Sequence, residues 1–275
     1  MLLSTADLHR VGDFLASAAQ TEIMPRFRNL SSADVQEKLS AFDVVTAADE
    51  AAEAVIAAGL REAFPHALIV GEEAAGRDPG LLGSLGSAEL AFLVDPIDGT
   101  KNFTANLPMF GLMAAATVRG EVVGGVIYDP ICRDWAYALR GEGAWLQAEN
   151  GSTTDLHVAA PVPPAEMHAV AGANFLPEPL RGTVSRNLPK VGMIFWLRCA
   201  AHECRMAAAG HCHLLVYNKL MPWDHAAGWL LHKEAGGYAA HFDGAPYHPT
   251  HLTGGLICAP DEASWHAART VLLDA

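Results

Sequence analysis

The 275-residue chain lacks any continuous run of 18 or more apolar residues. A membrane-spanning helix needs such a run, so the sequence excludes one. The first twenty residues, MLLSTADLHRVGDFLASAAQ, also lack a basic segment ahead of an apolar stretch. Their apolar residues instead have the spacing of an amphipathic helix. We therefore expect no secretory signal and a cytoplasmic location.

Paired cysteines and positive charge are scarce as well. The five cysteines are an odd number without a CxxC pair, so we expect reduced thiols and no disulfide framework. Eighteen basic residues against 31 acidic ones give a formal net charge of −13. This charge repels polyanions, so we expect neither nucleic acid nor a membrane as a partner. An anionic substrate would need a local cation, which a divalent metal ion can supply.

The first half of the chain contains patterns for two helices and a sheet. Apolar spacing predicts a helix within residues 6–29, which Pro25 and the polar stretch after it should end or kink. It predicts a second helix at residues 47–63, with Thr46 as its N-cap. Short apolar strands between residues 67 and 146 predict a mostly antiparallel sheet. Residues 77–87 are rich in glycine and serine and predict a surface loop.

The second half alternates short strands with helices, including helices at residues 197–209 and 226–234. The segment 150–165, which contains Gly, Ser, Thr and Pro, is the best candidate boundary. We therefore predict an N-terminal α+β subdomain at residues 1–150 and a C-terminal α/β subdomain at residues 151–275.

The stretch DPIDGT places Asp95 and Asp98 three residues apart, directly after an apolar strand. Two carboxylates within ~5–6 Å repel each other unless one is protonated or a cation lies between them. Mg²⁺ prefers carboxylate and carbonyl oxygens and adds phosphate oxygens. Gly99 permits a tight turn, after which the N–H groups of Gly99 and Thr100 can point into one anion-binding concavity. The stretch can hold a cation and a phosphate together, although a capping turn is the simpler alternative.

Acidic residues also follow two other elements. Glu72 and Glu73 come after a buried strand and a glycine, and Asp224 lies at the beginning of a helix. Taken alone, the glutamates would be a solvated pair and Asp224 a helix N-cap. Because α/β folds place their sites where strands end and helices begin, the three segments together predict one acidic site.

Four segments resemble, in order, the inositol monophosphatase superfamily of Mg²⁺-dependent, lithium-sensitive phosphomonoesterases. They are Lys38 with DVVTAAD (43–49), GEE (71–73), DPIDGT (95–100) and WDHAAG (223–228). The combination of DPIDGT with a later WDxAAG is highly specific, and the match covers most of the chain. The resemblance implies an α/β fold, the layered αβαβα sandwich of the inositol monophosphatase and fructose-1,6-bisphosphatase type, and a homodimer.

The resemblance also implies a role for each matching residue. The ligands of two or three Mg²⁺ ions would be Glu72, Asp95, Asp98, Asp224 and the backbone carbonyl of Ile97. Thr100, paired with Asp49, would orient and deprotonate the attacking water, with Glu72 and Asp98 beside it. The N–H groups of Gly99 and Thr100 would hold phosphate oxygens, and Asp224 would also face the substrate. Lys38 and Glu73 would lie just outside the metal site.

The substrate side departs from the family pattern. Members that bind inositol phosphates commonly have Gly-Ser/Thr-Ala near residue 198 and a glutamate at the position of Tyr217. Here Arg198 suits a second phosphate or a carboxylate, or else is an exposed arginine at a helix start. Tyr217 either stacks on a base or sugar or belongs to the core of a strand. Residues 199–213 contain three cysteines and three histidines, but their spacing fits no standard zinc site.

These features predict a Mg²⁺-dependent phosphomonoesterase that hydrolyses a small phosphorylated sugar, polyol or nucleotide. Within this class, a 3′(2′),5′-bisphosphate nucleotide, fructose 1,6-bisphosphate and histidinol phosphate are alternative substrates. The alternative from another class is a regulatory binding protein that uses a phosphatase fold without turnover.

Overall fold

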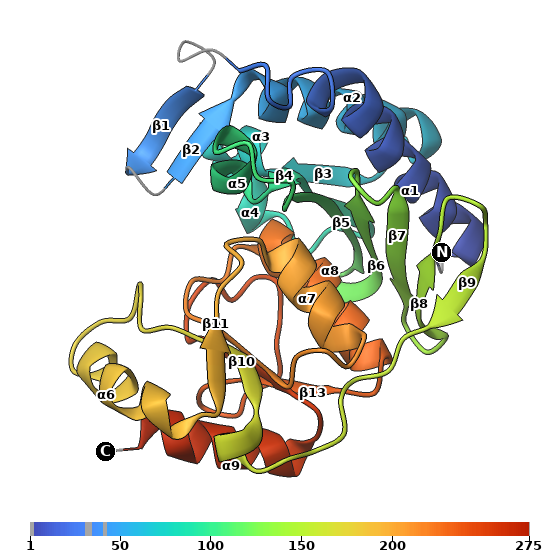
Figure 1. Ribbon diagram of the computed structural model, residues 1–275. Coiled ribbons are helices and arrows are strands. Elements are labelled where there is room, and N and C mark those ends of the chain that lie inside the picture. Colours follow the sequence, from blue (N-terminus) through green and yellow to red (C-terminus); the bar gives the residue numbers. More distant parts are fainter. Residues whose placement is uncertain (1–2, 31–34, 41–42, 275) are drawn as a thin grey trace.

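The computed structural model describes residues 3–30, 35–40 and 43–274; for residues 35–40 and 43–45 it describes the backbone alone. Helices α1 (Thr5–Ala18) and α2 (Ala47–Ala63) pack against each other over one face of a large sheet (Figure 1). Each helix begins with a capping box. In it, the side chain of the N-cap Ser or Thr accepts from a backbone N–H of the first turn, and the side chain of the Asp three residues later accepts from the N–H of the N-cap residue. The predicted N-cap Thr46 is confirmed.

The large sheet has seven strands in the order β3-β4-β5-β6-β7-β8-β9. The strands are β3 (Leu68–Gly71), β4 (Ala91–Asp98), β5 (Gly111–Val118), β6 (Glu121–Asp129), β7 (Asp134–Leu139), β8 (Gly143–Gln147) and β9 (Thr153–Asp155). Only β3 and β4 among these pairs are parallel. The predicted mostly antiparallel sheet is therefore confirmed.

A second sheet has five strands in the order β11-β10-β12-β14-β13. The strands are β10 (His168–Val170), β11 (Met193–Phe195), β12 (Leu214–Tyr217), β13 (Tyr238–His241) and β14 (Leu256–Ala259). Helix α9 (Glu262–Leu273) packs on this sheet, and α6 (Leu180–Asn187) packs on α9 (Figure 1). The chain passes from the first sheet to the second between Asp155 and His168; a division into subdomains there stays a prediction.

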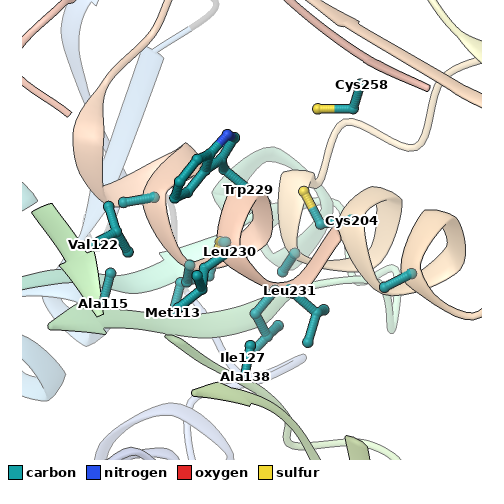
Figure 2. Close-up of a cluster of buried hydrophobic side chains, with 14 of the residues drawn as sticks. Met113, Ala115, Val122, Ile127, Ala138, Cys204, Trp229, Leu230, Leu231 and Cys258 are labelled. Carbon is teal, nitrogen blue, oxygen red and sulfur yellow. The ribbon is translucent and has the colours of Figure 1, made fainter. Parts of the chain in front are cut away.

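Helices α7 (Ala200–Ala208) and α8 (Pro222–Glu234) form the layer between the two sheets. Ten of the thirteen residues of α8 are buried, because this helix has protein on every side. Leu230 and Leu231 pack toward Met113 and Ile127 of the large sheet (Figure 2). The layers are therefore helix, sheet, helix, sheet, helix, and the predicted αβαβα sandwich is confirmed.

Some predicted boundaries were confirmed and others were wrong. The first helical segment ends just before Pro25, as predicted: α1 ends at Ala18, and a π-helical turn, Ala19–Ile23, follows it. Residues 77–87 contain a short helix, α4 (Gly80–Gly83), and Leu85 is fully buried, so the segment is anchored to the core.

The helices of the middle layer also begin at other residues than predicted. Helix α7 begins at Ala200, because Arg198 has φ = 56° and cannot belong to a right-handed helix. Helix α8 begins four residues earlier than predicted, with Pro222 in its first turn, where proline is favoured. The pattern analysis missed helices α3 (Glu72–Arg77) and α5 (Thr100–Thr104) and the hairpin of β1 (Val35–Ser40) and β2 (Asp43–Thr46).

No helix within the described residues has the length and hydrophobicity needed to cross a bilayer.

The contact between β6 and α8 depends on Gly125. A Cβ atom there would lie 2.9 Å from the carbonyl oxygen of Ala227 and 3.1 Å from its Cα. Both are backbone atoms, so no side-chain rotation can relieve the clash. We expect Gly125→Ala to lower the stability by ~1–3 kcal/mol, the usual cost of overpacking a core.

Thermal unfolding measures this effect, with Gly83→Ala as the matched control. A Cβ at Gly83 would meet no atom within 4 Å, so this variant should unfold near the wild-type temperature. Equal melting temperatures for Gly125→Ala and the control would show that the two layers do not need this close approach.

Candidate active site

Three carboxylates from three elements converge at one edge of the large sheet. Glu72 is the first residue of α3, Asp95 lies in β4, and Asp224 lies in the first turn of α8. One oxygen from each lies within 4.8 Å of the other two. Asp95 is only 2% exposed, and its burial, with the charges of Glu72, Asp98 and Asp224, raises its pKa well above the usual range.

A bulge in β4 gives the DPIDGT segment its shape. Asp95 pairs with Met113 and Asp98 with Gly111, so β4 has one residue more than β5 over this interval. Pro96 lies inside the bulge, where its missing N–H is not needed. The N–H of Ile97 donates to Asp95 Oδ1 at 3.0 Å, which fixes the turn locally. The strand can therefore end with both aspartates at the same edge.

Gly99 completes this turn with a left-handed backbone, φ = 89°. A Cβ atom there would lie 3.0 Å from the carbonyl oxygen of Met109 and 3.3 Å from Cys199 Sγ. The position therefore requires glycine for both conformation and space. Helix α5 begins at the next residue, Thr100.

Thr100 and Asp49 are brought together as predicted by the resemblance. The Thr100 hydroxyl lies 3.3 Å from Asp49 Oδ1 and 2.9 Å from the carbonyl oxygen of Ile97. The other oxygen of Asp49 accepts from the N–H and the hydroxyl of Thr46, at 2.8 and 2.7 Å. Burial raises the pKa of Asp49 to about 7, against the lowering effect of the Thr46 hydrogen bonds. The capping box of α2 thus also orients a side chain of the site.

Asp98 faces the beginning of α7. Its Oδ2 accepts from the N–H of Ala201 at 2.7 Å, and its backbone carbonyl accepts a weak hydrogen bond from the Cys199 thiol at 3.6 Å. Burial raises the pKa of Asp98, and the hydrogen bonds from Cys199, Ala201 and Ala200 oppose the increase. Asp98 therefore lies near the three converging carboxylates, but its own hydrogen bonds come mainly from the beginning of α7.

Glu53 is a site-forming residue that the pattern analysis missed. Its carboxylate, 5% exposed, accepts from the N–H of Glu73 at 2.7 Å and from that of Ala74 at 2.9 Å, at the beginning of α3. A Cβ at Gly71 would lie 2.3 Å from this carboxylate, so the GEE segment needs its glycine. Glu73, also buried, is held just beside Glu72. The signal was the spacing of Asp49 and Glu53 on one face of α2, since like charges four residues apart are unfavourable on an exposed helix.

The structure places the remaining predicted residues as follows. Lys38 lies on β1, and its side chain is outside the described part of the chain. Arg198 is exposed in the loop before α7 and forms no salt bridge within the described ranges. Tyr217 lies at the end of β12, and its hydroxyl donates to Glu203 Oε2 at 3.1 Å. Glu203 was also missed by the pattern analysis.

The cysteines and histidines of residues 199–213 form no group of three metal ligands within the described residues. Cys199, Cys204 and Cys212 are buried, and burial raises the pKa of each thiol. These side chains therefore belong to the core, in agreement with their spacing.

Comparison with known proteins identifies the family. The model of the inositol monophosphatase family matches residues 8–273. The chain belongs to the inositol monophosphatase family. The resemblance inferred from DPIDGT and WDHAAG is thereby confirmed.

Individual relatives agree with the family assignment. The chain is 33% identical over 225 residues to the Nus factor SuhB of Salmonella typhimurium, an alignment that covers 78% of this chain and 77% of that protein. It is 30% identical over 212 residues to the fructose-1,6-bisphosphatase/inositol-1-monophosphatase of Thermotoga maritima, with 77% and 76% covered. The crystal structure of the extragenic suppressor protein suhB from Bartonella henselae has a TM-score of 0.82 at 27% identity and covers 98% of this chain and 100% of its own.

The carboxylates of this site should make the protein sensitive to pH in the absence of metal ions. Asp49, Asp95 and Asp98 hold their protons more tightly in the folded state than in the unfolded state, because each pKa is raised. For Asp49, this contribution to stability is complete below the unfolded pKa of about 4 and is lost as the pH rises toward about 7. The contributions of Asp95 and Asp98 change in the same direction. We expect the melting temperature in EDTA to fall between about pH 5 and about pH 8, and Mg²⁺ to restore it mainly at the higher pH.

Melting curves of Asp95→Asn and of Asp78→Asn isolate this effect from the general charge of the protein. Asp95→Asn should flatten the pH dependence, whereas Asp78 is exposed and its variant should behave like the wild type. A pH dependence that is unchanged by Asp95→Asn would contradict the assignment of the repulsion to this site.

Proposed function

We propose that the protein is a Mg²⁺-dependent phosphomonoesterase that acts on a small phosphorylated sugar, polyol or nucleotide. The observation that carries the proposal is the convergence of Glu72, Asp95 and Asp224 next to the Thr100–Asp49 pair. The donor set fits magnesium, because it consists of oxygens from a buried aspartate and partly buried carboxylates that repel one another without a cation. The family is typically metal-dependent, which agrees with this donor set.

In this proposal Glu72, Asp95, Asp98, Asp224 and the carbonyl of Ile97 hold two or three Mg²⁺ ions. When bound, magnesium would lower the pKa of a water molecule and neutralise charge on the phosphate group. The acidic site would repel a phosphate ester without this charge inversion.

The other groups of the site position the reactants. Thr100 can donate its single hydroxyl proton to Asp49 or to the carbonyl of Ile97, which leaves its oxygen free to accept a hydrogen bond from the attacking water. With a pKa of about 7, Asp49 is suited to take up a proton near neutral pH. The N–H groups of Gly99 and Thr100 would hold phosphate oxygens, and Glu72 would face the water from the other side.

The substrate should carry a second anionic group. Arg198 is exposed in the loop whose next residue, Cys199, contacts Asp98, and a guanidinium suits a phosphate or a carboxylate. This favours a bisphosphate over inositol monophosphate, whose usual glutamate contact is replaced by Tyr217. We further propose a homodimer that works in the cytoplasm, which agrees with the free cysteines.

A regulatory binding protein is the second candidate, because relatives at 32–33% identity are named Nus factor SuhB. The two candidates differ in whether the site turns over a phosphate ester. An assay for phosphate release therefore decides between them.

We expect phosphate release at millimolar Mg²⁺ from at least one member of a panel of four substrates: inositol 1-phosphate, fructose 1,6-bisphosphate, 3′-phosphoadenosine 5′-phosphate and histidinol phosphate. Thr100→Ala should lower kcat by ~10²–10⁴-fold, as for the loss of a group that positions or transfers a proton. Thr104→Ala is the matched control, because Thr104 lies in the same helix and its hydroxyl donates only to Lys101 in the same turn.

Three results would count against the enzyme or against the role of the Thr100–Asp49 pair. Absence of release from the whole panel would favour the binding protein. An unchanged rate for Thr100→Ala, or an equal loss for Thr104→Ala, would show that the reaction takes place without the proposed Thr100–Asp49 pair.

A further inference from the structure

The backbone of Leu197 is fixed by hydrogen bonds at both of its polar groups. Its N–H donates to Glu203 Oε1 at 3.0 Å, and its carbonyl accepts from Asn102 Nδ2 at 2.8 Å. Asn102 also donates to the carbonyl of Met109 at 2.8 Å. Asn102 and Glu203 are each 1% exposed, so neither bond competes with bulk water. Leu197, in the loop before α7, thus links Asn102 of α5 to Glu203 of α7.

Glu203 is held in turn by Tyr217. The hydroxyl of Tyr217 donates to Glu203 Oε2 at 3.1 Å, so that each carboxylate oxygen has its own donor. Burial raises the pKa of Glu203 to about 7, while the hydrogen bonds from Leu197 and Tyr217 act in the opposite direction. A buried carboxylate depends on such partners, because its desolvation is costly.

Arg198 directly follows Leu197, whose backbone is fixed by these hydrogen bonds. Its left-handed backbone, φ = 56°, is unfavourable for a residue other than glycine and persists where surrounding contacts determine it. Its side chain is exposed. Further along the chain, the carbonyl of Arg198 accepts a long hydrogen bond from Asn102 Nδ2 at 3.5 Å. The Cys199 thiol and the N–H of Ala201 then donate to Asp98, and none of these bonds involves Tyr217. The bonds to Leu197 therefore bear chiefly on Arg198.

We propose that Glu203 and Tyr217 are positioning residues: they hold Leu197 so that Arg198 is presented to a second anionic group of the substrate. This inference rests on the proposed function and makes its substrate class specific. At the position where inositol-binding members of the family have a glutamate, Tyr217 uses its hydroxyl on Glu203 and not on a substrate hydroxyl. In this proposal, Arg198 determines substrate selectivity by binding an anionic group, in place of the glutamate that contacts a substrate hydroxyl.

The selectivity of Tyr217→Phe tests the proposal, because this change removes only the hydroxyl. With fructose 1,6-bisphosphate we expect KM to rise about tenfold at nearly constant kcat, the usual weight of one hydrogen bond to a charged group. With p-nitrophenyl phosphate, which has no second anion, both parameters should stay at the wild-type values. Tyr238→Phe, the same change on β13 of the same sheet, should alter neither substrate.

A double-mutant cycle shows whether Tyr217 acts through Arg198. In an Arg198→Ala background, Tyr217→Phe should add no further increase in KM for fructose 1,6-bisphosphate. Glu203→Gln, which keeps an acceptor for Leu197, should lose less selectivity than Glu203→Ala. Thermal unfolding of every variant separates these effects from a loss of folding.

The outcomes are distinguishable. A wild-type protein that releases phosphate from no member of the four-substrate panel would remove the proposed function itself. A wild type that hydrolyses only the monophosphates of the panel would leave the proposed function standing and overturn the present inference. If the wild type is active, equal losses on both compounds or additive effects of Tyr217→Phe and Arg198→Ala would overturn the positioning role. Additivity confined to KM would mean that Tyr217 contacts the substrate directly.

Discussion

Mutual repulsion between Glu72, Asp95 and Asp224 is the constraint around which this molecule is organised. Their oxygens lie within 4.8 Å of one another, and Asp95 is almost completely buried. Such an arrangement costs free energy in the folded state unless a cation or protons occupy it. The surrounding fold must therefore hold the three side chains together against their own charge. It does so by taking each from a different element, and α3, β4 and α8 are fixed relative to one another because all three contribute to one hydrophobic cluster.

Helix beginnings are the devices that hold the site. The Thr46–Asp49 capping box starts α2 and also presents Asp49 to Thr100. Glu53 binds the first N–H groups of α3 and so fixes the helix that carries Glu72. Asp98 accepts from the start of α7. In each case an acidic side chain satisfies backbone donors that a helix leaves unpaired, and the same bond sets the geometry of the site. Stability and positioning are therefore not separable at these residues.

The sequence predicted which acidic residues gather at the site better than it predicted how they are held there. Asp95, Asp98 and Asp224 could be recognised because their spacing is short or their segments, DPIDGT and WDHAAG, are specific. The layered fold followed from the same segments, and the antiparallel sheet followed from short apolar strands. Glu53 and Glu203 could not be placed in this way, because their partners lie 20 and 14 residues away or in other elements. The π-helical turn after α1 and the late start of α7 were missed for a related reason. A π-helical turn and the left-handed Arg198 depend on tertiary contacts that periodicity does not contain.

The two faces of the site differ in how they are built. On the metal side, the candidate ligands come from the ends of secondary structure, where few substitutions would preserve the geometry. On the proposed substrate side, Arg198 lies in a loop. Glu203 and Asn102 hold this loop through the backbone of Leu197, and Tyr217 holds Glu203. A loop of this kind can change its recognition by changing either the presented side chain or the residues that hold it. Residues 198 and 217 both differ from the inositol-binding pattern, and the hydrogen bonds through Leu197 and Glu203 link the loop of one to the hydroxyl of the other. Under the proposed function, the two differences therefore act together, because Tyr217 holds Glu203 and Glu203 holds the loop that carries Arg198.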